Sequence, residues 1–261
     1  MKDIIITSLE TITAFDVVSG AYMWTLDELQ NATISNTEEK TDITGKQGRK
    51  LSSLKRNKGV TVSGSNGLFS GGLLETQSGG KFSNTVTEVA WTDYLVVSDK
   101  KATTSYKAVG TTGAEITGLF IRNNDGTLGD SLEQDSAAAA GKFAYAPATK
   151  ELTFNEDVAD NTEIVVYYKR KITADVLVNN SDSYSKKAML YIDAIGEDKC
   201  ANIYHLQFFI PKADFSGEYE IEMGDDQTIQ NFEAEALSGA CGTGGALWTF
   251  TVFGEDAADA E

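Results

Sequence analysis

Very few residues in this sequence have side chains that typically carry out catalysis or bind metals. The chain has one histidine, His205, and two cysteines, Cys200 and Cys241. His205 lies in an alternating stretch typical of a β-strand, so we expect a structural role for it, and a zinc site would need more ligands. Two cysteines are too few for a disulfide framework, and we expect both as free, buried thiols.

Two further segments contain residue types that occur in enzyme sites. Residues 239–245 are rich in glycine, but they lack the lysine and the strand-to-helix context of a nucleotide-binding loop, which favours a flexible turn. Asp225 and Asp226 lie in a Gly-Asp-Asp-Gln sequence typical of a hairpin turn, where weak cation binding stays open. The sequence also lacks a nucleophile elbow. We therefore expect no enzyme activity, no catalytic residue, no metal site and no cofactor.

The distribution of charge points to an interaction surface instead. The formal net charge is −17, which argues against a general affinity for nucleic acid or anionic lipid. Six basic residues nevertheless fall within thirteen positions that contain no acid, so the rest of the chain carries −23. A basic segment on an acidic body suits self-association between copies, and a solvated basic loop is an equally simple alternative. The six residues are Lys46, Arg49, Lys50, Lys55, Arg56 and Lys58.

These basic residues belong to a long polar segment, residues 35–60. A polar excursion of this length is uncommon within a compact domain and indicates function or disorder. Its flanks, 32–34 and 60–62, have the sequences of two strands of one hairpin, so each arm could project up to about 40 Å. We predict that the segment contacts another subunit through the six basic residues and through three apolar ones that a monomer would leave exposed. These are Ile43, Leu51 and Leu54.

The elements that must position this segment are mostly β-strands. Most of the sequence alternates between apolar and polar residues with a period of two. Residues 71–77, closed by Gly79-Gly80, give the best signal for a short helix, and 123–126 for a turn. We expect a mainly β fold of sandwich or barrel type with one or two short helices. Strands are expected within 12–26 (a hairpin with Ser19-Gly20 as its turn and Val17 in a strand), 163–169, 202–208, 218–223 and 246–253.

Strand length and aromatic content divide the chain into sections. Residues 1–100 and 172–254 have long strands and many aromatics and are expected to form one β-sandwich core. Residues 101–171 have short strands at intervals of about 8–12 residues, which predicts a β-rich, possible immunoglobulin-like insertion. About 70 residues is marginal for an independent core, so we expect this insertion to pack on the rest. Residues 255–261 form an acidic tail.

The sequence also bears on location. No apolar run approaches the roughly 20 residues that a membrane helix needs. The first residues, MKDIIITSLE, lack the apolar segment of a signal peptide. We therefore expect synthesis in a cytoplasm and no membrane partner.

Five segments follow one another in an order that is informative as a whole. WTLDELQNATI at 24–34 precedes DITGKQGRKL at 42–51, and FFIPKADFSG at 208–217 precedes FEAEAL at 232–237 and LWTF at 247–250. In this order the chain resembles the major tail, or tail tube, proteins of tailed bacteriophages, of the siphophage type. The resemblance covers both outer sections and is weakest across 101–171.

The resemblance implies a virion structural protein that is made in the host cytoplasm. Six copies would close into a ring, and rings would stack into a tube that conducts DNA without binding it specifically, in company with other tail proteins. An acidic lumen would repel phosphate. Glu218, Glu220 and Glu222, on one face of an expected strand, could face that lumen, although a solvent-exposed outer face explains them equally well. A capsid decoration protein or an adhesin-like, surface-binding β-sandwich is the alternative.

Overall fold

The computed structural model describes residues 3–223, 229–238 and 245–254. Its internal contacts divide the chain into unit 1, Met1–Phe82 with Leu177–Glu261, and unit 2, Ser83–Val176. Several features singled out above lie outside the described residues. They are Asp225, Asp226, Cys241, most of the glycine-rich segment and the acidic tail.

The described chain is mainly β, as expected, with one α-helix and one short 3-10 turn. The elements of unit 1 are β1 (Ile4–Asp16), β2 (Tyr22–Leu26), β3 (Leu29–Thr44), η1 (Lys46–Gly48), β4 (Lys50–Asn66), α1 (Gly71–Ser78), β12 (Lys187–Asp198), β13 (Ile203–Phe215), β14 (Ile221–Glu222), β15 (Ile229–Ala236) and β16 (Thr249–Gly254). Those of unit 2 are β5 (Ser83–Val96), β6 (Lys101–Thr103), β7 (Ile116–Arg122), β8 (Leu128–Asp135), β9 (Lys142–Ala146), β10 (Glu151–Phe154) and β11 (Glu163–Val176).

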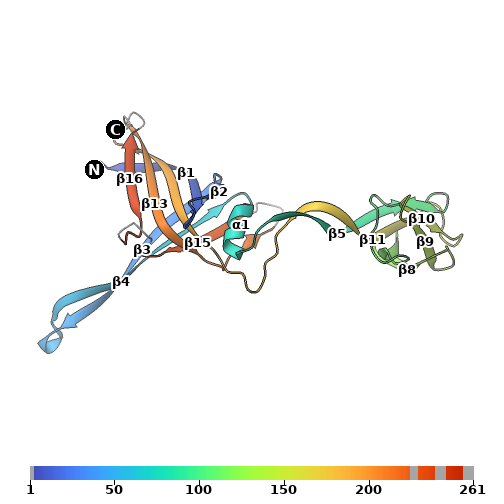
Figure 1. Cartoon of the computed structure of the whole chain (residues 1–261), viewed down its shortest axis with the longest axis horizontal. Helices are drawn as coiled ribbons and strands as arrows, with labels where there is room; N and C mark the ends of the chain where they lie inside the picture. Colours follow the sequence, from blue (N-terminus) through green and yellow to red (C-terminus); the bar gives the residue numbers. More distant parts are fainter. Residues whose placement is uncertain (1–2, 224–228, 239–244, 255–261) are drawn as a thin grey trace. The chain divides into compact units, whose positions relative to one another are not determined.

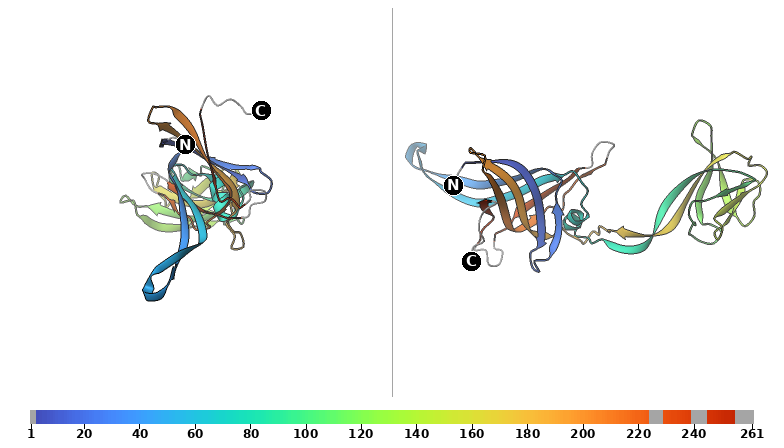
Figure 2. Two further views of the ribbon diagram at one scale, coloured as in Figure 1. Left: turned by 90° about the vertical axis from the view of Figure 1, so that its left-hand side faces the viewer. Right: turned by 90° about the horizontal axis from the view of Figure 1, so that it is seen from above.

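The strands of unit 1 form one curled antiparallel sheet (Figures 1 and 2). Its order is β2-β1-β12-β13-β15-β4-β3, and β14 and β16 pair with β15 and β13. The alternating sequences place every second side chain on the concave face, where they form one apolar core. Each large aliphatic or aromatic side chain buried there contributes about 1.5–3 kcal/mol. The core includes Trp24, Val62, Leu73, Leu190, Ile210 and Phe232.

The hairpin predicted within residues 12–26 is confirmed. β1 pairs with β2 from Ile12↔Leu26 to Phe15↔Tyr22. The carboxylate of Asp16 accepts hydrogen bonds from the Ser19 backbone (2.7 Å) and hydroxyl (2.7 Å), which lower the pKa of Asp16. Gly20 has a φ of +69°, the left-handed conformation that glycine adopts without strain. Val17 belongs to this turn and not to a strand.

The predicted helix is also confirmed, as α1. Ser70 caps its start, where its hydroxyl accepts a hydrogen bond from the backbone N–H of Leu73 (3.3 Å). Gly79 ends it in the left-handed conformation, with a φ of +73°. The indole Nε1 of Trp24 donates to Thr76 Oγ1 (2.8 Å), which fixes the helix against β2.

Two further local expectations are wrong. Only Ile221 and Glu222 of residues 218–223 form a strand. The backbone N–H of Ser216 donates to Glu233 O (2.8 Å) just after β13, and the chain bends at Gly217, so the alternating residues that follow make no ladder before 221. Cys200 is exposed, because it lies in the tight β12–β13 turn and not within a strand.

Unit 2 is a second, smaller β-structure with its own apolar core. The strand order is β5-β11-β7-β8-β9-β10-β6, and β8 and β9 form its parallel pair. Asn123–Gly126 is the predicted turn, closed by a hydrogen bond from Asn123 N to Thr127 O (2.9 Å). The unit extends beyond residues 101–171 at both ends, because β5 and β11 pair along their full lengths. Its core contains Leu119, Phe143, Leu152, Phe154, Ile164 and Val166.

Candidate functional site: the projecting hairpin

Residues 36–60 of unit 1 form a two-stranded ribbon, which we call the projecting hairpin. β3 and β4 stay paired from Leu29↔Asn66 to Thr44↔Lys50. β15 pairs with β4 only as far as Thr61. Beyond this point neither strand pairs with a third strand in the described chain. At the base of the ribbon, Val60 still belongs to the core, and Asn36 Oδ1 accepts a hydrogen bond from Trp248 Nε1 (3.2 Å). From Thr37 and Gly59 outwards the ribbon stands clear of the sheet (Figures 1 and 2).

The tip of the projecting hairpin is short and ordered. Only residues 45–49 lie between the strands, and the Gly45 N–H closes the turn on Arg49 O at 2.7 Å. Gln47 and Gly48 both have positive φ, 66° and 74°. The side chain of Leu51 lies over Gly45, where a Cβ would meet Leu51 Cδ1 at 2.7 Å. The polar excursion read from the sequence is therefore a paired ribbon with a five-residue tip.

Two of the six predicted basic residues are held within the ribbon itself. Lys50 Nζ lies 2.7 Å from Asp42 Oδ1, and Lys55 Nζ lies 2.7 Å from Glu38 Oε1. The hydrogen bond from Lys55 lowers the pKa of Glu38. Because these pairs are exposed, they add little to stability, but they tie both lysines to the opposite strand.

The other predicted interface residues are open to solvent. Lys46, Arg49, Arg56 and Lys58 form no ion pair with any described residue. Three apolar side chains are also exposed: Ile43 (42%), Leu51 (59%) and Leu54 (42%). Ile43 and Leu54 share one face, because Leu54 is directly opposite Thr41, two positions from Ile43. The structure thus brings free positive charge and exposed apolar groups together on one element.

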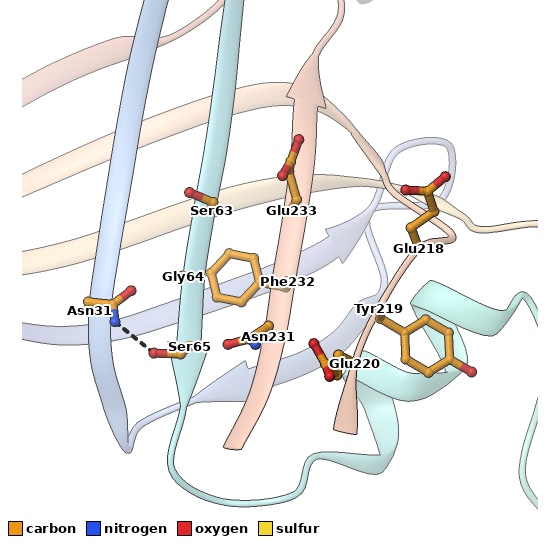
Figure 3. A pocket seen from close by; sticks show the side chains of 10 residues that line it. All are labelled: Asn31, Ser63, Gly64, Ser65, Glu218, Tyr219, Glu220, Asn231, Phe232 and Glu233. Carbon is orange, nitrogen blue, oxygen red and sulfur yellow. Dashed lines mark hydrogen bonds between the residues drawn. The ribbon is translucent and has the colours of Figure 1, made fainter. Parts of the chain in front are cut away.

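A hollow on the solvent face of unit 1 lies at the base of β3, β4 and β15 (Figure 3). The floor of the hollow is formed by the small residues Ser63, Gly64 and Ser65 on β4. The Asn31 side-chain amide donates a hydrogen bond to Ser65 Oγ at 2.8 Å. The segment before β14 forms one wall. We call this feature the basal hollow. Its lining residues are Asn31, Ser63, Gly64, Ser65, Glu218, Tyr219, Glu220, Asn231, Phe232 and Glu233.

The basal hollow brings together glutamates that the sequence had not connected. Of the three predicted on one face, Glu218 and Glu220 line it, and Glu222 does not. Glu233 was missed. The alternation of residues 232–236, with buried Phe and Ala and exposed Glu, places Glu233 and Glu235 on the solvent face of β15 and could have identified it. A second hollow shares Glu233, and no basic residue lines either. Its lining residues are Ser185, Asp214, Phe215, Ser216, Glu233, Ala234 and Glu235.

The single histidine, which was considered first for chemistry, lies within a strand of the sheet. His205 lies in β13, where its ring stacks on that of Phe253 with 5.5 Å between centroids. Within the part of the chain that the structure describes, no group of three or more His, Cys, Asp or Glu is arranged to hold a metal ion. In the same residues, no helix has the length and apolarity needed to cross a membrane.

The curled sheet, its flanking helix and the projecting hairpin define a mainly β protein of sandwich or barrel type. The model of the YomU/Tube protein family matches residues 4–246, nearly the whole chain, and the chain belongs to this family. This match confirms the resemblance to phage tail tube proteins and favours a structural protein over an enzyme. The comparison with curated proteins finds no match.

Proposed function

We propose that this protein is a virion component that assembles with copies of itself into stacked rings, six copies to a ring. The stack forms the phage tail tube, through which DNA passes. Membership of the YomU/Tube family supports a place in the tail. The observation that carries the self-assembly is the projecting hairpin, which pairs with no third strand among the described residues and whose apolar and cationic side chains are exposed.

The physical argument concerns the stability of an isolated ribbon. A two-stranded hairpin is at best marginally stable in water. The arms of the projecting hairpin have no third strand among the described residues, and Ile43 and Leu54 are exposed on one face. Docking on a second copy would bury these groups and give the ribbon the support that its own chain does not provide.

Unpaired strand edges support closure into a ring. Among the described strands, β2 pairs only with β1, and β3 pairs only with β4. The part of β1 that runs past β2 also exposes Ile5 and Ile6. Free edges tend to pair with other chains, and closing a sheet around a ring removes them.

The charge of the chain supports passage of DNA without binding. At −17, the protein would repel phosphate along most surfaces, so a strand inside the tube would gain no affinity from counterion release. A lumen-facing position for Glu218, Glu220 and Glu222 is one proposal, and a position away from the lumen is its alternative. For Glu218 and Glu220 the lumen-facing position excludes a contact with another copy at the basal hollow. No specific observation favours a capsid decoration protein or an adhesin-like protein, and the family favours the tail.

Truncation of the projecting hairpin tests the proposal. Thr37 and Gly59 are directly paired, so residues 38–58 can be replaced by Asn-Gly without touching the core. We expect a folded, soluble protein that no longer forms tubes in negative-stain micrographs.

A companion variant, Lys50→Gln/Lys55→Gln, tests whether these two lysines, whose charge is paired within the ribbon, are needed for assembly. It releases both internal ion pairs and keeps the tip and the apolar groups, so we expect tubes. Normal tubes from the truncated variant would show that the hairpin has no part in assembly.

A further inference from the structure

We propose that the basal hollow of one copy receives the hairpin tip of a second copy. This inference rests on the proposed function and adds to it the acceptor surface. The occupant is therefore the same chain, and the contact is between the cationic tip, residues 45–49, and the glutamates of the hollow.

Charge complementarity is the first support. The charged residues that line the hollow are Glu218, Glu220 and Glu233, all exposed and without an ion pair among the described residues. The tip presents Lys46 and Arg49, likewise exposed and without such a pair. Opposite charges left open on two surfaces of one chain attract between copies, and they suppress docking of either surface on its own kind.

The other groups of the hollow suit the chemistry of the tip. A guanidinium such as that of Arg49 has five donors in a planar fork that matches a carboxylate. The side chain of Asn231 lies on β15 on the side of Glu220, and that of Asn31 lies across β4, so both amide oxygens offer acceptors along the hollow (Figure 3).

Geometry makes the contact intermolecular. The tip precedes β4, and the floor of the hollow, Ser63 to Ser65, is near the other end of the same strand. The tip therefore points away from the hollow of its own chain. A surface at one end of a molecule that fits a different surface at the other end repeats without closing into a dimer, as a stack requires.

The length of β4 limits the repeat of the stack. Fifteen positions separate Arg49 from Gly64 in the sequence, and at about 3.3 Å per residue an extended strand spans about 50 Å at most. The axial distance between successive rings should therefore not exceed about 50 Å, which electron microscopy of assembled tubes measures directly.

Charge reversal on each side tests the contact in the full chain. We expect Lys46→Glu/Arg49→Glu and Glu218→Lys/Glu233→Lys each to raise the concentration needed for tube formation by about tenfold or more, because like charges would then face each other. Combining all four changes in one chain should restore tubes. Glu88→Lys/Glu156→Lys, which makes the same charge change as the reversal in the hollow but at exposed sites in unit 2, is the control and should assemble normally.

Sedimentation and micrographs read out assembly, and thermal unfolding checks that each variant is folded. If the tip reversal blocks tubes and the reversal in the hollow does not, the hollow is the wrong acceptor and the role of the hairpin stands. Failure of the combined variant to recover, with its fold intact, also overturns the contact. If neither reversal affects assembly, both the acceptor and the cationic role of the tip are wrong.

Discussion

The carboxylate of Asp93, on β5 of unit 2, is buried and serves as a junction for side chains from three segments. It accepts hydrogen bonds from Trp91 Nε1 (3.0 Å), from the Ser105 backbone (2.7 Å) and hydroxyl (2.8 Å), and from the Tyr168 hydroxyl (2.8 Å). Burial by itself would raise the pKa of Asp93, but these hydrogen bonds outweigh it and lower the pKa below its ordinary value. The buried charge therefore holds the loop around Ser105 against β5 and β11.

Replacing Asp93 should weaken unit 2 and change its response to acid. An amide in Asp93→Asn turns one acceptor into a donor and leaves Tyr168 or Ser105 unsatisfied, which we expect to cost about 1–3 kcal/mol. Because the folded-state pKa lies below the unfolded value of about 3.9, the carboxylate stabilises the fold above about pH 4, and this stability is lost as pH falls through the lowered pKa. Denaturant unfolding between about pH 2 and about pH 6 measures both effects. A variant with the same pH dependence as the parent would contradict this role.

At the scale of elements, the end of α1 shows why one glycine is required. Gly79 has a φ of +73°, and a Cβ there would lie 2.0 Å from the carbonyl oxygen of Tyr184. Gly20, in the β1–β2 turn, has nearly the same φ, +69°, but nothing within 4 Å of its Cβ position. The two glycines thus share a backbone conformation and differ in the space around them.

Alanine substitutions at Gly20 and Gly79 should separate the energetic cost of a positive φ from that of a steric clash. Gly20→Ala carries only the strain of positive φ, about 1 kcal/mol. Gly79→Ala adds a clash with backbone that must shift, so we expect its loss of unfolding free energy to be clearly larger. Thermal and denaturant unfolding of both variants give the comparison. Equal losses would mean that the Tyr184 segment moves aside freely.

At the scale of the whole molecule, unit 1 and unit 2 have separate cores. The apolar cluster of each is built from its own residues. Ser83 and Val176 are directly paired where β5 begins and β11 ends, so the chain enters and leaves unit 2 at neighbouring positions. Unit 2 can thus be removed without breaking a strand of the unit 1 sheet.

We expect a chain in which residues 83–176 are replaced by Asn-Gly to fold and to form tubes. The core of unit 1, the projecting hairpin and the basal hollow all remain in it. Circular dichroism and negative-stain microscopy test the two parts of this prediction. A folded variant that stays monomeric would assign unit 2 a direct role in assembly.

The sequence by itself determined the local elements of this protein. The β1–β2 hairpin, α1 and the turn at Asn123–Gly126 depend on residues within a few positions of one another, and period-two alternation marks most strands. The pairing of the two arms of the projecting hairpin was also predictable, because residues 32–34 and 60–62 are complementary strands around one polar segment. Short-range physics decides all of these features.

Only the tertiary structure decided which distant segments meet. The basal hollow joins Asn31 to residues 63–65, 218–220 and 231–233, and no local pattern encodes that meeting. The tertiary structure also decided which lysines of the projecting hairpin form internal ion pairs, because Lys50 and Lys55 lie beside acidic residues of the opposite strand. The alternation at 218–223 predicted a longer strand than the fold allows, because a strand needs a partner along its length and not only a pattern.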